Sequence, residues 1–474
     1  MIRMLFLCLI FFVTILFFIK KTTWKKRHDR VFACRPHSNS SVSSSMTANG
    51  PRSYPLIGST LSFNKNRRRL LQWYTELLPN PENVEYILKT NFFNFPKGKP
   101  FTDLLGDLLG KGIFNVDGHS WSSQRKLASH EFSTRSLRSF AFKALKEEVE
   151  NRLVPVLSAV ADVGTTLDMQ DVLKRFAFDV VCKVSLGWDP DCLDLTRPVN
   201  ALAQAFDTAA EISARRATEP VYAVWKVKRL VNVGSERRLS EAIRTVHVLV
   251  SEIVRDKKKT AGHDGESVRD MVISFIMAGR EAHCLEQATP AMTWLFWLLT
   301  ENDDVERKLL EEVDPLISLG LGFEELKEMS YTKACLCEAM RLYPPVSWDS
   351  KHAANNDVLP DGTRVKKGDK VTYFPYGMGR MEKLWGKDWE EFEPNRWFES
   401  EPGSAEPVLK PAGPRVCVGK EMAFMQMKYI VGSVLSRFFV SLLTAHMAGG
   451  LKVNIKRREV KSHTSLTKKI YTII

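Results

Sequence analysis

The sequence has few cysteines, and they follow no spacing that would pair them. Eight cysteines are scattered over 474 residues. Cys335 and Cys337 are only two residues apart on one predicted helix, which is too close for an unstrained disulfide. This distribution argues against a disulfide-stabilised extracellular domain. We therefore expect a reducing compartment that faces the cytosol.

Nucleic-acid-binding motifs and internal repeats are also missing, and strand signals are few. The net charge is +13, which we interpret as a solvated basic surface able to attract anionic lipid or an acidic redox partner. Hydrophobic residues make up 44% of the chain, enough for a large core. We expect a monomer that binds no nucleic acid and is mainly α-helical with small β-sheets.

Long hydrophobic runs are limited to the N-terminus, where residues 4–19 are apolar apart from Thr14. A cleaved signal peptide would carry its charges before such a run and a small-residue site after it. Here only Arg3 precedes the run, and the basic residues Lys20, Lys21, Lys25, Lys26 and Arg27 follow it. This order predicts a single-pass anchor, with the rest of the chain in the cytosol.

The anchor is short, which suits a thin bilayer such as that of the endoplasmic reticulum. We expect three parts: a transmembrane anchor over residues 1–19, a basic and serine-rich linker over 20–50, and a folded domain over 51–474. Hydrophobic periodicity predicts helices over 67–78, 81–90, 119–130, 134–159, 169–186, 198–215, 234–259, 266–300, 302–313 and 324–342. Strands are predicted over 358–365 and 369–374, with a further C-terminal pair that includes 451–455.

The most informative stretch surrounds Cys417. A lone cysteine is most often a small buried hydrophobe. In this stretch, however, Gly413 and Gly419 allow tight turns, Arg415 supplies a nearby cation, and helix-forming residues begin directly after Gly419. The positive end of a helix favours thiolate over thiol. This arrangement suits an axial ligand of haem iron, so Cys417 is our candidate metal ligand.

Two further pairs of residues have helical spacing. Glu338 and Arg341 are three residues apart on an apolar predicted helix, which favours a buried ion pair over an exposed one. Arg396 is the candidate third member of that cluster. Trp121 and Arg125 are four residues apart. They are either a core tryptophan with an exposed arginine or, if haem binds, part of its site.

Taken together and in this order, these segments resemble the cytochrome P450 superfamily of haem-thiolate monooxygenases, from about residue 54 to the end. The resemblance implies haem b with Cys417 as axial ligand, and propionates held by Arg125 and Arg415 beside Trp121. It also implies electrons from NADPH through a reductase. The residues that match the motifs of the family are Gly413, Arg415, Cys417 and Gly419, Glu338 and Arg341, Trp121 and Arg125, and, on the oxygen-side helix, Ala278, Gly279 and Glu281.

Finer stretches resemble the plant clan of fatty-acid ω-hydroxylases, and most of all its branch that oxidises jasmonoyl-isoleucine. These stretches cover residues 91–99, 112–118, 373–381 and 443–447. The resemblance implies insertion of one oxygen atom from O₂ into the terminal C–H bond of a lipid-like substrate. Expected pocket walls are residues 101–116, 276–278 and 346–348. A substrate carboxylate could pair with Arg215 or Arg216, although a solvated role is commoner for such residues.

Some positions depart from the pattern of the family. Glu281 is followed by Ala282 and His283, where a threonine is expected, and Lys410 replaces a phenylalanine. A strand hairpin near residues 78–81 and most of the C-terminal loop are missing by comparison. Two alternatives therefore remain open beside a monooxygenase: a haem enzyme of the same fold that rearranges hydroperoxides, and a degenerate, non-catalytic copy.

Overall fold

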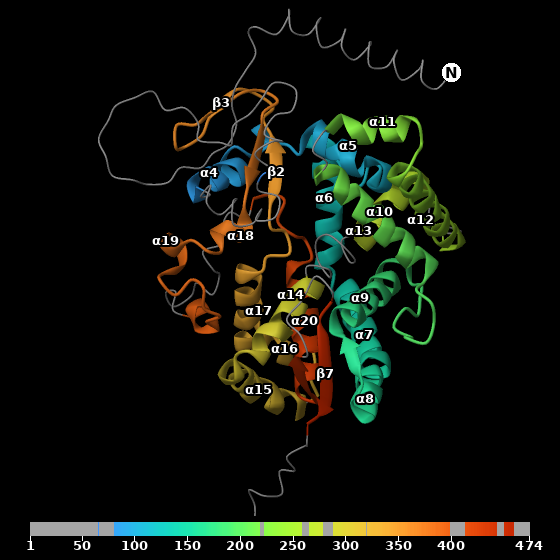
Figure 1. The fold of residues 1–474 in the computed structure, drawn as a ribbon, viewed down its shortest axis with the longest axis vertical. Coiled ribbons are helices and arrows are strands. Elements are labelled where there is room, and N and C mark those ends of the chain that lie inside the picture. The colour runs from blue at the N-terminus through green and yellow to red at the C-terminus, as the bar shows by residue number, and fades with distance from the viewer. Residues whose placement is uncertain are drawn as a thin grey trace, which may run out of the picture.

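The computed structural model describes residues 65, 80–218, 222–257, 265–277, 288–318, 320–398, 413–442 and 450–458. Helices dominate these residues, and the described strands form small antiparallel sheets, as the sequence predicts (Figure 1). No helix in these ranges is long and apolar enough to cross a membrane. The predicted anchor over 1–19 and linker over 20–50 lie outside the described residues.

The N-terminal part of the described chain runs through helices up to α9. Asn80 caps the first of them through its side chain, and Asp168 caps α9 by accepting hydrogen bonds from the backbone N–H groups of Gln170 and Asp171. These elements are α4 (Pro81–Glu85), the π-helix Tyr86–Thr90, the 3₁₀-helix Phe92–Asn94, α5 (Gly98–Leu109), α6 (Gly118–Ser133), α7 (Arg135–Glu148), the π-helix Val149–Leu153, α8 (Val154–Val163) and α9 (Met169–Leu186).

The middle of the chain is also helical. The elements are α10 (Ala201–Thr218), α11 (Tyr222–Leu230), α12 (Ser235–Lys257), α13 (Gly265–Met277), α14 (Ala288–Thr300), α15 (Asp303–Ser318), α16 (Glu325–Glu328) and α17 (Ser330–Leu342). The long helix predicted over 266–300 appears as α13 and α14, and residues 278–287 between them are not described.

The C-terminal part carries most of the strands and one long helix. The helices are α18 (Pro375–Met378), α19 (Glu382–Trp385), the 3₁₀-helix Pro394–Trp397 and α20 (Lys420–Leu435). The strands of the whole fold are β1 (Thr166–Asp168), β2 (Asp349–His352), β3 (Asp357–Val358), β4 (Arg364–Val365), β5 (Lys370–Tyr373), β6 (Phe438–Leu442) and β7 (Lys452–Arg457). Within the described chain β2 pairs with β5, β3 with β4, and β7 lies between β1 and β6.

The main hydrophobic core lies around α9, α14, α17 and α20, which are central in Figure 1. Helix α14 packs against the other three, and large side chains such as Phe178 and Phe296 are almost fully buried there. The helices α10 and α12 pack together at one side, against α5 and α11. Burial of this apolar surface is the main term that stabilises the fold.

Asp168 joins the start of α9 to the C-terminal sheet. Besides capping α9, its carboxylate accepts hydrogen bonds from Leu451 N (3.1 Å) and Lys452 Nζ (3.0 Å). Gly450 precedes these residues with a φ of 89°, and an added Cβ there would lie 1.9 Å from Asp168 Oδ2. The close approach therefore requires glycine.

Most of the predicted helices are confirmed, and α9 has the predicted bounds. The helix predicted over 67–78 lies outside the described residues. The turn over residues 360–363 joins β3 and β4 as expected, and β7 confirms the C-terminal strand. The sequence did not predict α5, α11, β1 or β2. The predicted helix over 134–159 contains a π-helical turn at Val149–Leu153, next to Pro155, which lacks the N–H that a continuous α-helix uses.

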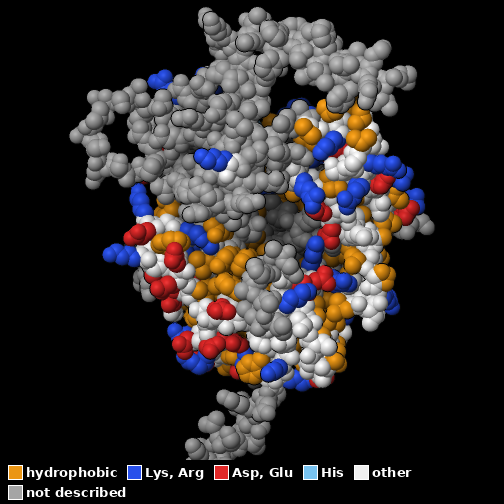
Figure 2. Space-filling model, in the orientation of Figure 1, with side chains coloured by type: hydrophobic (Ala, Val, Ile, Leu, Met, Phe, Trp, Pro, Cys, Tyr) orange, Lys and Arg blue, Asp and Glu red, His pale blue; other side chains and the backbone are white. Residues whose placement is uncertain are grey.

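Charged side chains are mixed in sign on the described part of the face shown in Figure 2. Basic and acidic groups alternate there with apolar side chains. The described part of this face therefore shows no single patch of one charge sign.

Candidate active site

The six residues that the sequence predicts as cofactor ligands line one cavity. Its volume is about 550 Å³, and its wall includes Trp121, Arg125, Gly413, Arg415, Cys417 and Gly419. These residues come from α6 and from the loop that leads into α20, about 290 residues apart in the sequence. The fold thus brings together two motifs whose connection the sequence could only suggest.

Cys417 is half-buried and lies three residues before the first residue of α20. Gly419 begins the helix, since its carbonyl accepts a hydrogen bond of 2.8 Å from Ala423 N. At the start of the loop, a Cβ on Gly413 would lie 1.7 Å from the carbonyl oxygen of Leu88. The loop can pass this close to Leu88 only without a side chain, which fixes the path of the chain toward Cys417.

Arg415 lies between an aromatic ring and a carboxylate. Its guanidinium carbon is 4.6 Å from the Trp121 ring centre, and its Nη2 donates a hydrogen bond of 2.5 Å to Asp117 Oδ1. Burial lowers the pKa of Arg415, although Asp117 and Asp349 oppose this effect. Its Nε is buried, and no described residue accepts a hydrogen bond from it. A buried donor without an acceptor favours an anionic ligand in the cavity.

Arg125 and Trp121 lie one turn apart on α6, on the side that faces the cavity. Arg125 donates a hydrogen bond through Nη1 to the carbonyl of Val416, the residue before Cys417. Trp121 is buried and packs against Phe92, with 5.3 Å between ring centres. The simpler alternative of a core tryptophan beside an exposed arginine is therefore wrong for Arg125, which is half-buried.

The predicted pair of Glu338 and Arg341 is fully buried on α17, and Arg396 joins it. Glu338 accepts hydrogen bonds of 2.8 Å from both arginines and one of 2.9 Å from Trp397 Nε1. Arg341 also donates to the carbonyls of Gly379, Trp389 and Glu391. The remaining donors are thus satisfied, which a buried ion pair requires. Trp397 was not singled out from the sequence.

All three predicted catalytic residues, Ala278, Gly279 and Glu281, lie outside the described residues. The departures at Ala282, His283 and Lys410 also lie outside them. The predicted pocket walls are confirmed in part: Phe101, Ile113, Phe114, Val346 and Trp348 line the cavity. On α13, however, Phe275 lines it, whereas Ile276 is buried in the main core.

The hypothesis that Arg216 pairs with a substrate carboxylate is wrong. Arg216 is 3% exposed, forms an ion pair with Glu236 on α12 and contacts Asp107 on α5 at 3.0 Å. It joins three helices and has a structural role. Its neighbour Arg215 is exposed and pairs with Glu211, one turn earlier on α10.

Five polar residues of the cavity wall were missed: Lys97, Asp349, Lys351, Tyr373 and Lys420. Lys351 forms an ion pair with Asp349, whose Oδ2 also accepts a hydrogen bond of 2.8 Å from the Tyr373 hydroxyl. Burial alone would raise the pKa of Asp349, but Lys351, Lys97 and Tyr373 outweigh it and lower the pKa to about 2. No local pattern indicates this cluster, because it depends on the pairing of β2 with β5.

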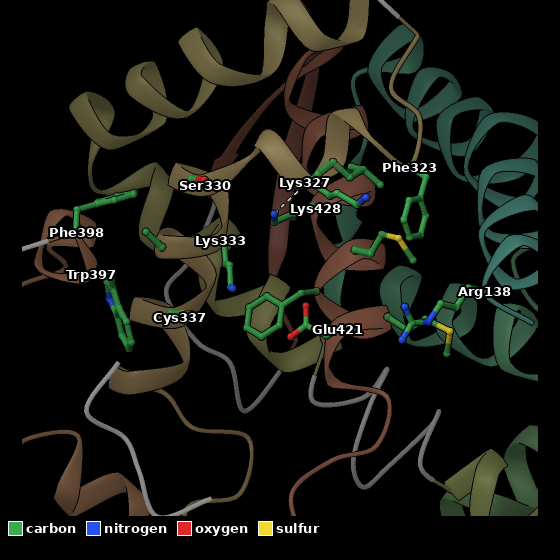
Figure 3. Close-up of a pocket in the computed structure, with 15 residues that line it drawn as sticks. Arg138, Phe323, Lys327, Ser330, Lys333, Cys337, Trp397, Phe398, Glu421 and Lys428 are labelled. Carbon is green, nitrogen blue, oxygen red and sulfur yellow. Dashed lines mark hydrogen bonds between the residues drawn. The ribbon is translucent and has the colours of Figure 1, made fainter. Parts of the chain in front are cut away.

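A second cavity, of about 590 Å³, lies between α16, α17 and α20 (Figure 3). Its wall is apolar around Phe323, Phe424 and Met425, but it also carries four cationic residues: Arg138, Lys327, Lys333 and Lys428. Lys428 is buried and donates a hydrogen bond of 2.8 Å to the carbonyl of Leu326. Glu421 and Met422 belong to the first turn of α20, so this cavity lies close to the Cys417 loop.

A half-buried cysteine before a helix, two arginines aimed at one cavity and a buried Glu–Arg–Arg cluster define the haem-thiolate class of proteins. In agreement, residues 67–448 match the sequence profile of the family Cytochrome P450. The chain belongs to that family of monooxygenases, which bind haem through a cysteine thiolate and receive electrons from a reductase.

Two relatives from Arabidopsis thaliana are particularly similar. Cytochrome P450 94B3 is 72% identical over 509 residues, covering 96% of this chain and 97% of the relative, and Cytochrome P450 94B1 is 68% identical, covering 86% and 91%. Cytochrome P450 94A1 from Vicia sativa is 42% identical, covering 86% and 91%. These matches confirm the resemblance to the plant ω-hydroxylase clan and to its jasmonoyl-isoleucine branch.

The alignment with Cytochrome P450 94B3 extends over 509 positions, more than the 474 residues of this chain. The relative therefore has positions without a counterpart here, which agrees with the segments that the sequence lacks by comparison with the family.

Replacing Glu338 tests the buried cluster. In Glu338→Ala, the guanidinium groups of Arg341 and Arg396 would lose their shared carboxylate, at a cost of about 3–5 kcal/mol in the free energy of unfolding. We expect little folded protein and rapid cleavage in limited proteolysis. The matched control is Asp304→Ala, which breaks an exposed pair with Arg307 at the same i,i+3 spacing. Equal protease resistance of the two variants would contradict a stabilising role for Glu338.

Proposed function

We propose that this chain is a haem-thiolate monooxygenase that hydroxylates the terminal carbon of a fatty acid or a fatty-acyl conjugate such as jasmonoyl-isoleucine. Residues 51–474 would form the catalytic domain, on the cytosolic side of the endoplasmic reticulum membrane. Residues 1–19 would be its anchor and residues 20–50 its linker. The single observation that carries the proposal is the convergence of Cys417, Arg415, Arg125 and Trp121 on one cavity.

The side chains that line the cavity suit both the apolar ring of haem and its carboxylate groups. Apolar and aromatic side chains such as Phe92, Ile113 and Val418 suit a flat, largely apolar ring. Arg125 and Arg415 suit its two carboxylate side chains, and the unused donor at Arg415 Nε is consistent with an anion beside it. Cys417 supplies the only sulfur among the residues of this cavity wall.

Bound haem supplies the activation of O₂, and the residues of the chain prepare the site for it. The N-terminus of α20 stabilises negative charge on the Cys417 sulfur, because the helix dipole is positive at this end. Arg125 and Arg415 would fix the orientation of the ring through its carboxylates. The resemblance alone assigns Ala278, Gly279 and Glu281 to the oxygen side of the site. Of these three, the Glu281 carboxyl group would deliver protons.

The substrate class follows from the resemblance and from the apolar part of the cavity wall. Phe101, Phe114 and Trp348 present aromatic surface next to the proposed haem site. Such surface excludes water and suits the end of an alkyl chain, whereas it offers little to a polar substrate end. An unactivated terminal C–H bond would thus be held toward the reactive centre.

The ligand assignment is tested by the absorption spectrum of the reduced, carbon-monoxide-bound protein. We expect a thiolate-type Soret band in the wild type and in Cys337→Ala, which removes another half-buried cysteine. Cys417→Ala should lose this band because no thiolate then reaches the iron. A thiolate-type band that persists in Cys417→Ala would refute the assignment.

Turnover distinguishes the three candidate functions. With NADPH and a plant P450 reductase, we expect jasmonoyl-isoleucine or a fatty acid to gain one oxygen atom at the terminal carbon, as read by mass spectrometry. Omission of NADPH is the control. Conversion of a lipid hydroperoxide without NADPH would support the rearranging enzyme instead. A thiolate-type band without any turnover would support a non-catalytic copy.

We further propose that the reductase docks over the second cavity. Its cations Arg138, Lys327 and Lys333 complement an acidic partner (Figure 3), and α20 begins directly after the Cys417 loop. Lys333→Glu should weaken reductase binding roughly fivefold at low salt, with less effect at high salt. The control is Lys366→Glu, an exposed lysine on the loop after β4. Equal binding by both variants would contradict this docking face.

A further inference from the structure

Lys97 is a buried cation on the wall of the haem cavity. It precedes α5, is 7% exposed and lines the same cavity as Cys417. Its Nζ donates a hydrogen bond of 2.8 Å to the carbonyl of Phe114 and lies 4.5 Å from the centre of the Phe101 ring. Within the described ranges, no carboxylate forms an ion pair with this ammonium group.

The nearest carboxylates are engaged elsewhere. Asp117 accepts hydrogen bonds from the backbone N–H groups of Lys97 and Gly98 and pairs with Arg415. Asp349 pairs with Lys351 and accepts a hydrogen bond from Tyr373. A buried ammonium beside such committed carboxylates is costly unless another anion approaches it.

The charges at the cavity wall do not balance. The wall carries five cationic residues, of which Lys420 is exposed, and one carboxylate, Asp349; a second carboxylate, Asp117, pairs with Arg415. The cations are Lys97, Arg125, Lys351, Arg415 and Lys420. Cations therefore outnumber carboxylates at this cavity, which suits a ligand with anionic groups such as the two carboxylate side chains of haem b. Arg125 and Arg415 are proposed to bind these carboxylates, and Lys351 pairs with Asp349. Lys97 is therefore the buried cation whose role is still unassigned.

With only its protein neighbours, Lys97 is hard to charge. Burial, together with the positive charges of Lys351 and Arg415, lowers the pKa of Lys97 to about 7, although the carboxylates of Asp349 and Asp117 oppose this effect. His352 also contacts the backbone of Lys97, since its Nδ1 lies 2.6 Å from the Lys97 carbonyl oxygen. An additional anion in the cavity would favour the protonated amine.

We propose that the Lys97 ammonium pairs with a haem carboxylate, as a third cation beside Arg125 and Arg415, and that haem binding is coupled to uptake of a proton by Lys97. The proposal rests on the haem site assigned above. It adds a pH-dependent element to that site, because the two arginines keep their charge throughout the neutral range and Lys97 does not.

The sign of the pH dependence follows from linkage. Haem binding favours the protonated amine, so the contribution of Lys97 to haem affinity is complete below pH 7. As the pH rises above 7, haem binding must draw a proton from solvent, and this contribution declines. A role limited to packing against Phe101 and Phe114 would not depend on pH in this way.

The test measures haem retention in the holoenzyme. Wild type, Lys97→Met and Lys99→Met are mixed with excess apomyoglobin, and the thiolate-type Soret band is read at equilibrium between pH 6 and pH 9. Lys99 is the matched control, because it lies two residues away, is exposed and pairs with Asp103. At pH 6 we expect about tenfold lower retention in Lys97→Met, the factor for one charge-assisted hydrogen bond. The difference should shrink as the pH rises.

Each outcome distinguishes this proposal from the proposed function. The role of Lys97 would be overturned if Lys97→Met retained as much haem as Lys99→Met, or if its loss of haem were the same at every pH. In either case a thiolate-type band in the wild type would still support the haem site. Absence of that band from the wild type would instead refute the proposed function itself.

Discussion

The buried carboxylate of Glu338 is the interaction on which the site depends most. It accepts hydrogen bonds from Arg341, Arg396, Trp397 and the backbone N–H of Glu393. These groups belong to α17 and to the segment that precedes the Cys417 loop. Because a buried carboxylate and two guanidinium groups are each unfavourable alone, the segments must stay together or the charges lose their partners. The cluster therefore holds residues 393–397, which precede the Cys417 loop, against α17.

The second constraint is the surplus of positive charge at the cavity. Glu338 satisfies its arginines within the protein, whereas the cations around Cys417 have too few carboxylates to match them. The first cluster stabilises the fold and the second favours an anionic ligand. The two arginines show this difference. The buried Nε of Arg415 has no acceptor among the described residues, whereas Arg341 donates hydrogen bonds to three backbone carbonyls as well as to Glu338.

Local patterns predicted the parts of this structure that depend on local forces. The spacing of apolar residues gave α9, and Asp168 and Gly187 at its ends explain why the bounds agree. The pattern failed for α5, which contains Pro100 and two glycines, because its helix is supported by contacts with α10 and α13. The pair Glu338 and Arg341 was found because both residues lie on one helix. Lys97 and Asp349 were missed because they meet only through tertiary folding.

The two cavities share the first turn of α20, and this has a consequence for electron transfer. Lys420 lines the cavity that contains Cys417, while Glu421 and Met422 line the second cavity. Successive residues of a helix point in different directions, so one turn can contribute to both walls. A partner seated over the second cavity would therefore contact the same helix end that follows the Cys417 loop. The cations there would attract the partner, and the same helix end would stabilise the thiolate.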